Sequence, residues 1–151
     1  MRAIVLLSKK FNKKHSMKTI KVNLLFLIFV SFLSVSCNQT SKLGPKTGFI
    51  NVKGGKVWYE IVGSGNKTPI FLLHGGPCVP SYYLNPLRVL ADDRPLIFID
   101  QLGCGRSDRI TDTLLMTPKI YTEQLEEIRK ALKLDEFYLY GQSWGTMLAT
   151  E

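Results

Sequence analysis

Cysteine and histidine are scarce in this chain, whose 151 residues include three cysteines and two histidines. No C-x-x-C pair occurs, and the cysteines and histidines do not cluster at the spacings that zinc sites use. The sequence therefore provides no set of metal ligands. We expect the protein to work with neither a metal nor a cofactor.

Excess positive charge is almost absent once the first 21 residues are set aside. The formal net charge of the whole chain is +8, but seven basic residues and no acidic ones lie before residue 22. From residue 22 onward, 13 basic residues face 12 acidic ones. A nucleic-acid-binding domain usually gathers its basic residues on one face or along one helix. We therefore expect no nucleic-acid partner.

The chain also lacks an apolar run of the roughly 20 residues that a membrane-spanning helix needs. Its longest apolar stretch, Leu24–Val30, follows the basic segment and extends with interruptions to Val35. A basic region followed by a short apolar core and small residues is typical of a secretory signal. Met17 is the more natural start, because Met17–Lys21 makes a compact basic region.

The end of this leader, Leu33–Cys37, resembles a bacterial lipobox, in which the cysteine is lipidated and becomes the mature N-terminus. Ser34 stands where the motif usually has leucine, and an ordinary cleaved signal and an uncleaved anchor remain as alternatives. We expect an exported lipoprotein anchored to the membrane, periplasmic or at the cell surface. The expected organisation is a leader over 1–37, a polar tether over 38–46 and a folded domain over 47–151.

Three short apolar strands are each followed by a turn rich in glycine. The strands and their turns are Ile70–Leu73 with His74–Pro77, Leu96–Ile99 with Asp100–Asp108, and Phe137–Tyr140 with Gly141–Gly145. In a parallel α/β sheet the carboxyl ends of the strands form the edge where ligands bind. The sequence therefore predicts an active site at that edge. We expect His74, Pro77, Asp100 and Gln101 to form its loops.

The third turn carries the pattern G-x-S-x-G, with Ser143 at its centre. A nucleophilic serine must stand clear of its own backbone on a sharp turn between a strand and a helix. Gly141 and Gly145 suit such a turn, because a side chain at either position would collide with the neighbouring strand or helix. The pattern predicts that Ser143 is a catalytic nucleophile.

The remaining segments predict a layer of helices around the sheet. Residues 47–52 and 56–62 favour a β-hairpin turned by Gly54 and Gly55. Residues 81–91 favour a helix, and Pro86 should either kink it or mark its true start. A further helix should begin at Thr117–Pro118, where a capping hydroxyl precedes a proline in the first turn.

Together the motifs HGGP at 74–77, DQxGxGxSD at 100–108 and GxSWG at 141–145 resemble the α/β-hydrolase superfamily, and within it the proline iminopeptidase-like aminopeptidases. The resemblance runs from about Thr47 to Glu151. It implies an α/β fold, the amino-terminal half of an α/β hydrolase: a hairpin plus parallel strands with flanking helices, ending at the nucleophile elbow. Cys78 and Thr146 stand where the commonest wording of the family has glycine.

The resemblance implies an acyl-enzyme on Ser143, with the Trp144 N–H and an N–H from Gly75 or Gly76 as oxyanion donors. In the superfamily the acid and the histidine follow the serine, and no histidine follows Ser143 here. We therefore expect an amino-terminal fragment that is inactive by itself. The alternative is a triad of His74, Asp100 and Ser143, an order that other serine hydrolases use.

The function that the resemblance implies is a serine aminopeptidase or amidase, acting on a small peptide or an amino-acid amide. An esterase or another hydrolase of the fold, and a non-catalytic remnant of the fold, are the alternatives. Cys78 and Cys104 follow neighbouring strands, and their spacing does not decide whether they pair.

Overall fold

The computed structural model describes residues 43–77 and 79–151. The expected leader, Cys37 and Cys78 lie outside these residues, so lipidation stays a prediction and the question of whether Cys78 pairs with Cys104 stays open. Within the described ranges, no helix is both long enough and apolar enough to cross a bilayer.

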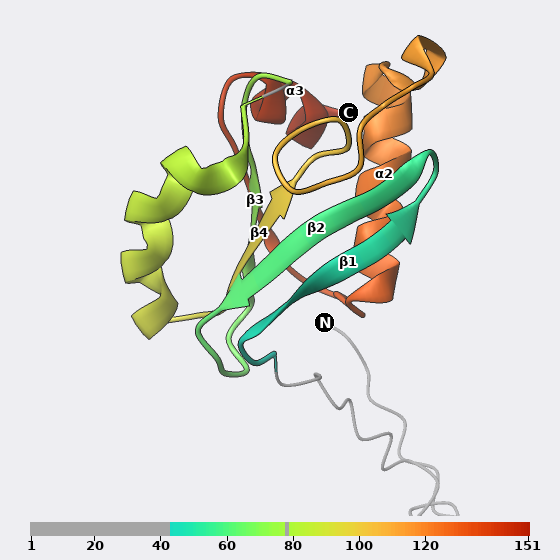
Figure 1. Cartoon of the computed structure of the whole chain (residues 1–151). Helices are drawn as coiled ribbons and strands as arrows, with labels where there is room; N and C mark the ends of the chain where they lie inside the picture. Colours follow the sequence, from blue (N-terminus) through green and yellow to red (C-terminus); the bar gives the residue numbers. More distant parts are fainter. Residues whose placement is uncertain (1–42, 78) are drawn as a thin grey trace, which may run out of the picture. The chain divides into compact units, whose positions relative to one another are not determined.

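A mixed five-stranded sheet forms the centre of the domain (Figure 1). Its strands are β1 (Lys46–Val52), β2 (Gly55–Val62), β3 (Ile70–Leu73), β4 (Leu96–Asp100) and β5 (Tyr138–Gly141), in the spatial order β1-β2-β4-β3-β5. The first two strands form the predicted hairpin, and β2 also pairs antiparallel with β4. The strands β4, β3 and β5 run parallel, so the three glycine-rich turns follow the same edge of the sheet.

The helices are η1 (Ser81–Asp92), η2 (Thr113–Leu115), α2 (Pro118–Ala131) and α3 (Trp144–Thr150). The start predicted for α2 is confirmed, because the Thr117 hydroxyl accepts a hydrogen bond from the Ile120 N–H and Pro118 is the first helical residue. Residues 81–92 form a 3₁₀ helix. Pro86 lies inside it and has no N–H to donate to the carbonyl of Tyr82, as an α-helix would require.

Two hydrophobic layers cover the two faces of the sheet, and β4 shows why both are needed. All five of its residues are buried, and successive side chains point to opposite faces. Ile97 and Ile99 pack in the layer that includes residues of α2 and α3, whereas Leu96 and Phe98 pack in the layer that includes residues of η1. A strand buried on both faces is expected in a parallel sheet with helices on each side.

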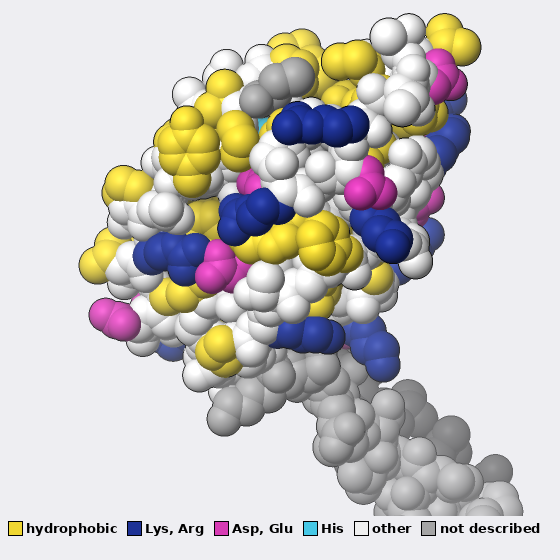
Figure 2. Space-filling model, in the orientation of Figure 1, with side chains coloured by type: hydrophobic (Ala, Val, Ile, Leu, Met, Phe, Trp, Pro, Cys, Tyr) yellow, Lys and Arg dark blue, Asp and Glu magenta, His cyan; other side chains and the backbone are white. Residues whose placement is uncertain are grey.

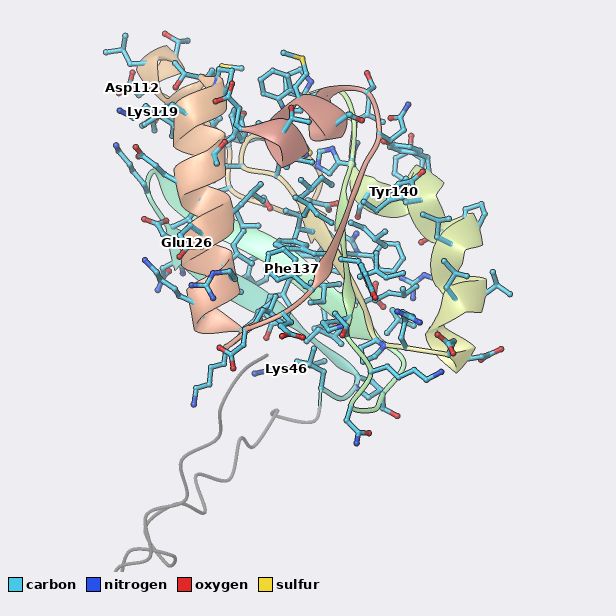
Figure 3. The ribbon with its side chains drawn as sticks, turned by 180° about the vertical axis from the view of Figure 1, so that it is seen from behind. Lys46, Asp112, Lys119, Glu126, Phe137 and Tyr140 are labelled. Carbon is cyan, nitrogen blue, oxygen red and sulfur yellow. The ribbon has the colours of Figure 1, made fainter. Side chains whose placement is uncertain are left out.

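The last strand, β5, has no strand on its outer side among the described residues. Tyr138, Leu139 and Tyr140 are exposed, whereas Phe137 packs edge-on against Phe71 at 5.9 Å between ring centroids. Figure 3 shows Phe137 toward α2 and Tyr140 toward η1, in keeping with the alternation of a strand. Apolar side chains therefore line both faces of an open sheet edge.

The surface shows no concentration of basic side chains on the face drawn in Figure 2, where lysine and arginine are interspersed with acidic residues. Several of the described cations are also paired, for example Arg88 with Glu60 and Lys53 with Glu123. Exposed apolar side chains gather instead on η1, which presents Tyr82, Val89 and Leu90 to solvent.

Candidate active site

Ser143 occupies a strained turn between β5 and α3. Its backbone has φ 51° and ψ −116°. Lys133 is the other non-glycine residue with a positive φ in the described part of the chain. Residues with a side chain rarely adopt this region, and they keep it only where the surrounding structure holds them there. Ser143 precedes the first residue of α3, yet its side chain does not cap the helix. Within the described residues, the hydroxyl is therefore not committed to capping the helix.

Both glycines of the motif are sterically required, as the sequence predicts. A Cβ on Gly145 would lie 2.2 Å from the Leu73 carbonyl oxygen, because α3 packs directly on the end of β3. A Cβ on Gly141 would lie 2.5 Å from the carbonyl oxygen of Gly145. Since both obstacles are backbone atoms, no rotamer change could relieve either clash.

His74 is fully buried beneath the active-site turns. Its Nε2 accepts a hydrogen bond of 2.8 Å from the Gln101 N–H, so its Nδ1 carries the proton and donates to the Gly75 carbonyl at 2.7 Å. Burial lowers the pKa of His74 below 6.5, although the bond to Gly75 and the charge of Asp100 act in the opposite direction. The ring is therefore neutral near pH 7, and both of its nitrogens are occupied.

Gln101 joins the three turns that follow the parallel strands. Besides its N–H bond to His74, its side-chain Nε2 donates to the His74 carbonyl at 2.8 Å. Its Oε1 accepts a bond of 3.0 Å from the indole Nε1 of Trp144. This buried amide links the turn after β3, the turn after β4 and the first residue of α3.

Asp100 is a buried carboxylate that stabilises the loop after β4. Its Oδ1 accepts bonds from the backbone and the hydroxyl of Ser81, and its Oδ2 accepts bonds from the backbone and the guanidinium of Arg106. Burial alone would raise the pKa of Asp100, but the hydrogen bonds from Arg106 and Ser81 outweigh it and hold the pKa below its usual value. Asp100 is thus an ionised structural anchor.

The turn after β3 is held against the serine turn by Tyr83, a residue of η1. The Gly75 N–H donates to the Tyr83 hydroxyl at 2.6 Å, and that hydroxyl donates to the Gln142 Oε1 at 2.8 Å. Sequence reasoning missed Tyr83, because nothing in its local pattern distinguishes it from the exposed Tyr82 beside it.

An open depression of about 380 Å³ lies between these two turns. It is lined by Gly75, Gly76, Val79, Tyr83, Gln142 and Ser143. The Trp144 N–H, at the start of α3, and the Gly76 N–H form no hydrogen bond within the described residues. Pro77 follows Gly76 in the same turn. The depression is therefore lined by Ser143 and by Gly76, whose N–H has no partner among the described residues.

The alternative triad is not assembled in this arrangement. The Nε2 of His74 is occupied by Gln101, Asp100 is bound by Ser81 and Arg106, and no hydrogen bond among the described residues joins Ser143 to either. The described residues also contain no cluster of three or more acidic, cysteine or histidine side chains that could hold a metal ion.

Comparison with known proteins identifies the fold. The family model for the alpha/beta hydrolase fold matches residues 68–151. The chain is 50% identical over 103 residues to a proline iminopeptidase of Heyndrickxia coagulans, a match that covers 68% of this chain and 36% of that protein. The predicted fold class is confirmed.

Solved structures agree with this result. The crystal structure of VinJ superposes with a TM-score of 0.66 at 30% identity, covering 70% of this chain and 38% of VinJ. The proline iminopeptidase of Mycobacterium smegmatis superposes with a TM-score of 0.63 at 27% identity, covering 68% of this chain and 37% of that protein. The chain spans about a third of the length of the curated relatives that it matches.

Proposed function

The chain belongs to the α/β-hydrolase family, and we propose that the protein is a serine hydrolase of the proline iminopeptidase kind. Its substrates would be small peptides, from which it releases the N-terminal residue, or amino-acid amides. The strained backbone of Ser143 is the observation that carries this proposal. Such a conformation, at the junction of a strand and a helix and beside an open depression, is typical of an exposed nucleophile.

In the proposed reaction the Ser143 oxygen attacks the carbonyl carbon of the scissile amide. The carbonyl oxygen then takes on negative charge, and the N–H groups of Trp144 and Gly76 donate hydrogen bonds to it. We prefer Gly76 to Gly75, because the Gly75 N–H already donates to Tyr83. Amide donors that are fixed before the reaction stabilise the developing charge at little reorganisation cost. The leaving amine takes up the proton that Ser143 gave to the base. Water then hydrolyses the ester on Ser143, which releases the acid and restores the serine hydroxyl.

The proton of Ser143 needs a base, and we propose that residues beyond Glu151 supply both this base and the acid that orients it. His74 is unsuited to the task, since its Nε2 accepts from Gln101 and its Nδ1 donates to Gly75. Its role is to hold the active-site turns. By itself the chain is then expected to be inactive, because serine is a weak nucleophile without an adjacent base.

We further propose that the protein is exported and anchored through a lipid on Cys37, as the leader predicts. The anchor would tether the hydrolase domain at a membrane surface and take no part in the chemistry.

A chimera tests the catalytic proposal. Residues 43–151 of this chain are joined to the part of the Heyndrickxia coagulans relative that follows its matched segment, and hydrolysis of proline arylamides is compared with that of aryl esters. Ser143→Ala should lower kcat by several orders of magnitude, the effect of removing a triad member. Ser64→Ala, at an exposed serine in a loop, is the matched control and should keep the parental rate.

Arylamide hydrolysis that depends on Ser143 supports an aminopeptidase or amidase. Hydrolysis of esters alone would favour the esterase alternative. A folded chimera that hydrolyses neither substrate would contradict the proposal.

A further inference from the structure

We propose that Tyr83 is a positioning residue for the oxyanion site, a role that rests on the proposed function of Ser143. The Tyr83 hydroxyl is the one group in the described residues that accepts a hydrogen bond from the turn after β3 and donates one to the turn that carries Ser143. It would therefore set the separation between the Gly76 N–H and the Trp144 N–H, which belong to these two turns.

The Tyr83 hydroxyl both accepts and donates a hydrogen bond. The hydroxyl oxygen accepts from the Gly75 N–H at 2.6 Å, and the hydroxyl proton goes to the Gln142 Oε1 at 2.8 Å. Because a phenol has one proton to donate, the direction of both bonds is fixed once Gly75 supplies its N–H. The hydroxyl thus has no proton left for a substrate.

The two turns also lie close together beside this bridge. A Cβ on Gly75 would lie 2.4 Å from the Gln142 Oε1, and 3.2 Å from the Ser143 Cβ. Gly75 and Gln142 therefore face each other directly, with the Tyr83 hydroxyl at their side. Loss of the hydroxyl would leave the Gly75 N–H and the Gln142 Oε1 without these partners. The bond from the Gln142 N–H to the Leu73 carbonyl at 3.2 Å still holds the base of the two turns together, so the change is a shift at their tips.

The position of Tyr83 in η1 explains how the bridge stays in place. Its ring is half-buried and packs against the layer formed by residues such as Trp58, Leu72 and Phe98. The ring is therefore fixed by the core while its hydroxyl reaches the rim of the depression. Its neighbour Tyr82 is 62% exposed, does not line this depression and forms no such bridge.

Tyr83→Phe in the chimera removes the bridge and keeps the ring, and Tyr82→Phe is the matched control. If the hydroxyl positions the oxyanion donors, kcat should fall roughly 10- to 100-fold, because a misplacement of about 1 Å can slow the chemistry by about 100-fold. KM should change less than about twofold, because the ground-state carbonyl depends little on these donors. Tyr82→Phe should retain the parental kcat.

A second readout separates positioning from folding. A prolyl boronic acid forms a reversible tetrahedral adduct on Ser143, and its affinity should weaken in Tyr83→Phe by about the same factor as kcat. Rates are expressed per active site titrated with an organophosphonate, so that misfolded protein does not count. If Tyr83→Phe does not fold, Gln142→Leu removes the acceptor at the other end of the bridge and should also lower kcat at nearly constant KM.

A Tyr83→Phe variant that is as fast as Tyr82→Phe would overturn the role of Tyr83 and leave the function of Ser143 standing. A higher KM at unchanged kcat would also overturn it, since Tyr83 would then be a substrate contact. A parental kcat in Gln142→Leu counts against it in the same way. A parent chimera without turnover contradicts the proposed function itself, and the catalytic role of Tyr83 with it.

Discussion

Substitution of Gly145 by alanine tests whether close packing of α3 on β3 holds the serine turn. The added Cβ would lie 2.2 Å from the Leu73 carbonyl oxygen, 2.7 Å from its carbonyl carbon and 2.8 Å from the His74 carbonyl oxygen. Real Cβ contacts essentially never fall below 3.0 Å, so the start of α3 must move away by about 0.8 Å. This shift carries Ser143 and the Trp144 N–H away from the turn of Gly76.

Two effects of different size should follow from that displacement. Overpacking against rigid backbone should cost about 1–3 kcal/mol in the free energy of unfolding. A misplacement of about 1 Å can slow chemistry roughly 100-fold, so the rate at which an organophosphonate modifies Ser143 should fall by about 10- to 100-fold. Thermal unfolding and the labelling rate of the chimera measure the two effects separately.

Gly44→Ala is the matched control, because no atom lies within 4 Å of the Cβ that it would introduce. Its labelling rate and its thermal midpoint should equal those of the parent. If Gly145→Ala were labelled at the parental rate with an unchanged thermal midpoint, packing of α3 on β3 would not be what holds the serine turn.

Three further predictions concern buried charge, pH and the leader. Asp100→Asn should lower the free energy of unfolding of the chimera by about 2–3 kcal/mol, measured by urea unfolding. This loss is near the lower end for a broken buried ion pair, because the Arg106 side chain is 48% exposed. An unchanged urea midpoint would contradict the anchoring role of Asp100. Because the pKa of His74 is lowered in the fold, the stability that its neutral form supports is complete above pH 6.5 and is lost as the pH falls below that value. In His74→Gln the free energy of unfolding should therefore depend less on pH between pH 7.5 and pH 5. A dependence equal to that of the parent would contradict the contribution of neutral His74 to stability. For the full chain expressed in bacteria, radiolabelled palmitate should enter the protein, and Cys37→Ala should abolish the label; labelling that persists would reject the lipobox.

Much of the framework could be predicted from local sequence. The strand β3 was expected at Ile70–Leu73, where it lies, and the cap and proline at Thr117–Pro118 indicate the start of α2. These features depend on patterns within a few residues, such as apolar runs that end in glycine. The need for glycine at positions 141 and 145 could also be predicted, because a sharp turn around a nucleophilic serine leaves no room for a side chain at these two positions.

The contacts that assemble the site could not be predicted in this way. The bridge from Tyr83 joins residues 59 positions apart, and the bond from Trp144 to Gln101 spans 43 positions. Each depends on the order of the strands and on the path of η1. The 3₁₀ geometry of residues 81–92 could not be predicted either. A proline indicates that a regular α-helix is disturbed, but it does not indicate which kind of helical geometry forms instead.

Ser143 is proposed as the acyl acceptor, and covalent labelling tests this role most directly. The chimera is treated with an organophosphonate, digested and analysed by mass spectrometry, with Ser143→Ala treated in parallel. We expect one modified peptide, which carries the adduct on Ser143, and no adduct in the variant. An adduct on another serine such as Ser81 or Ser107, or equal labelling of parent and variant, would contradict the account.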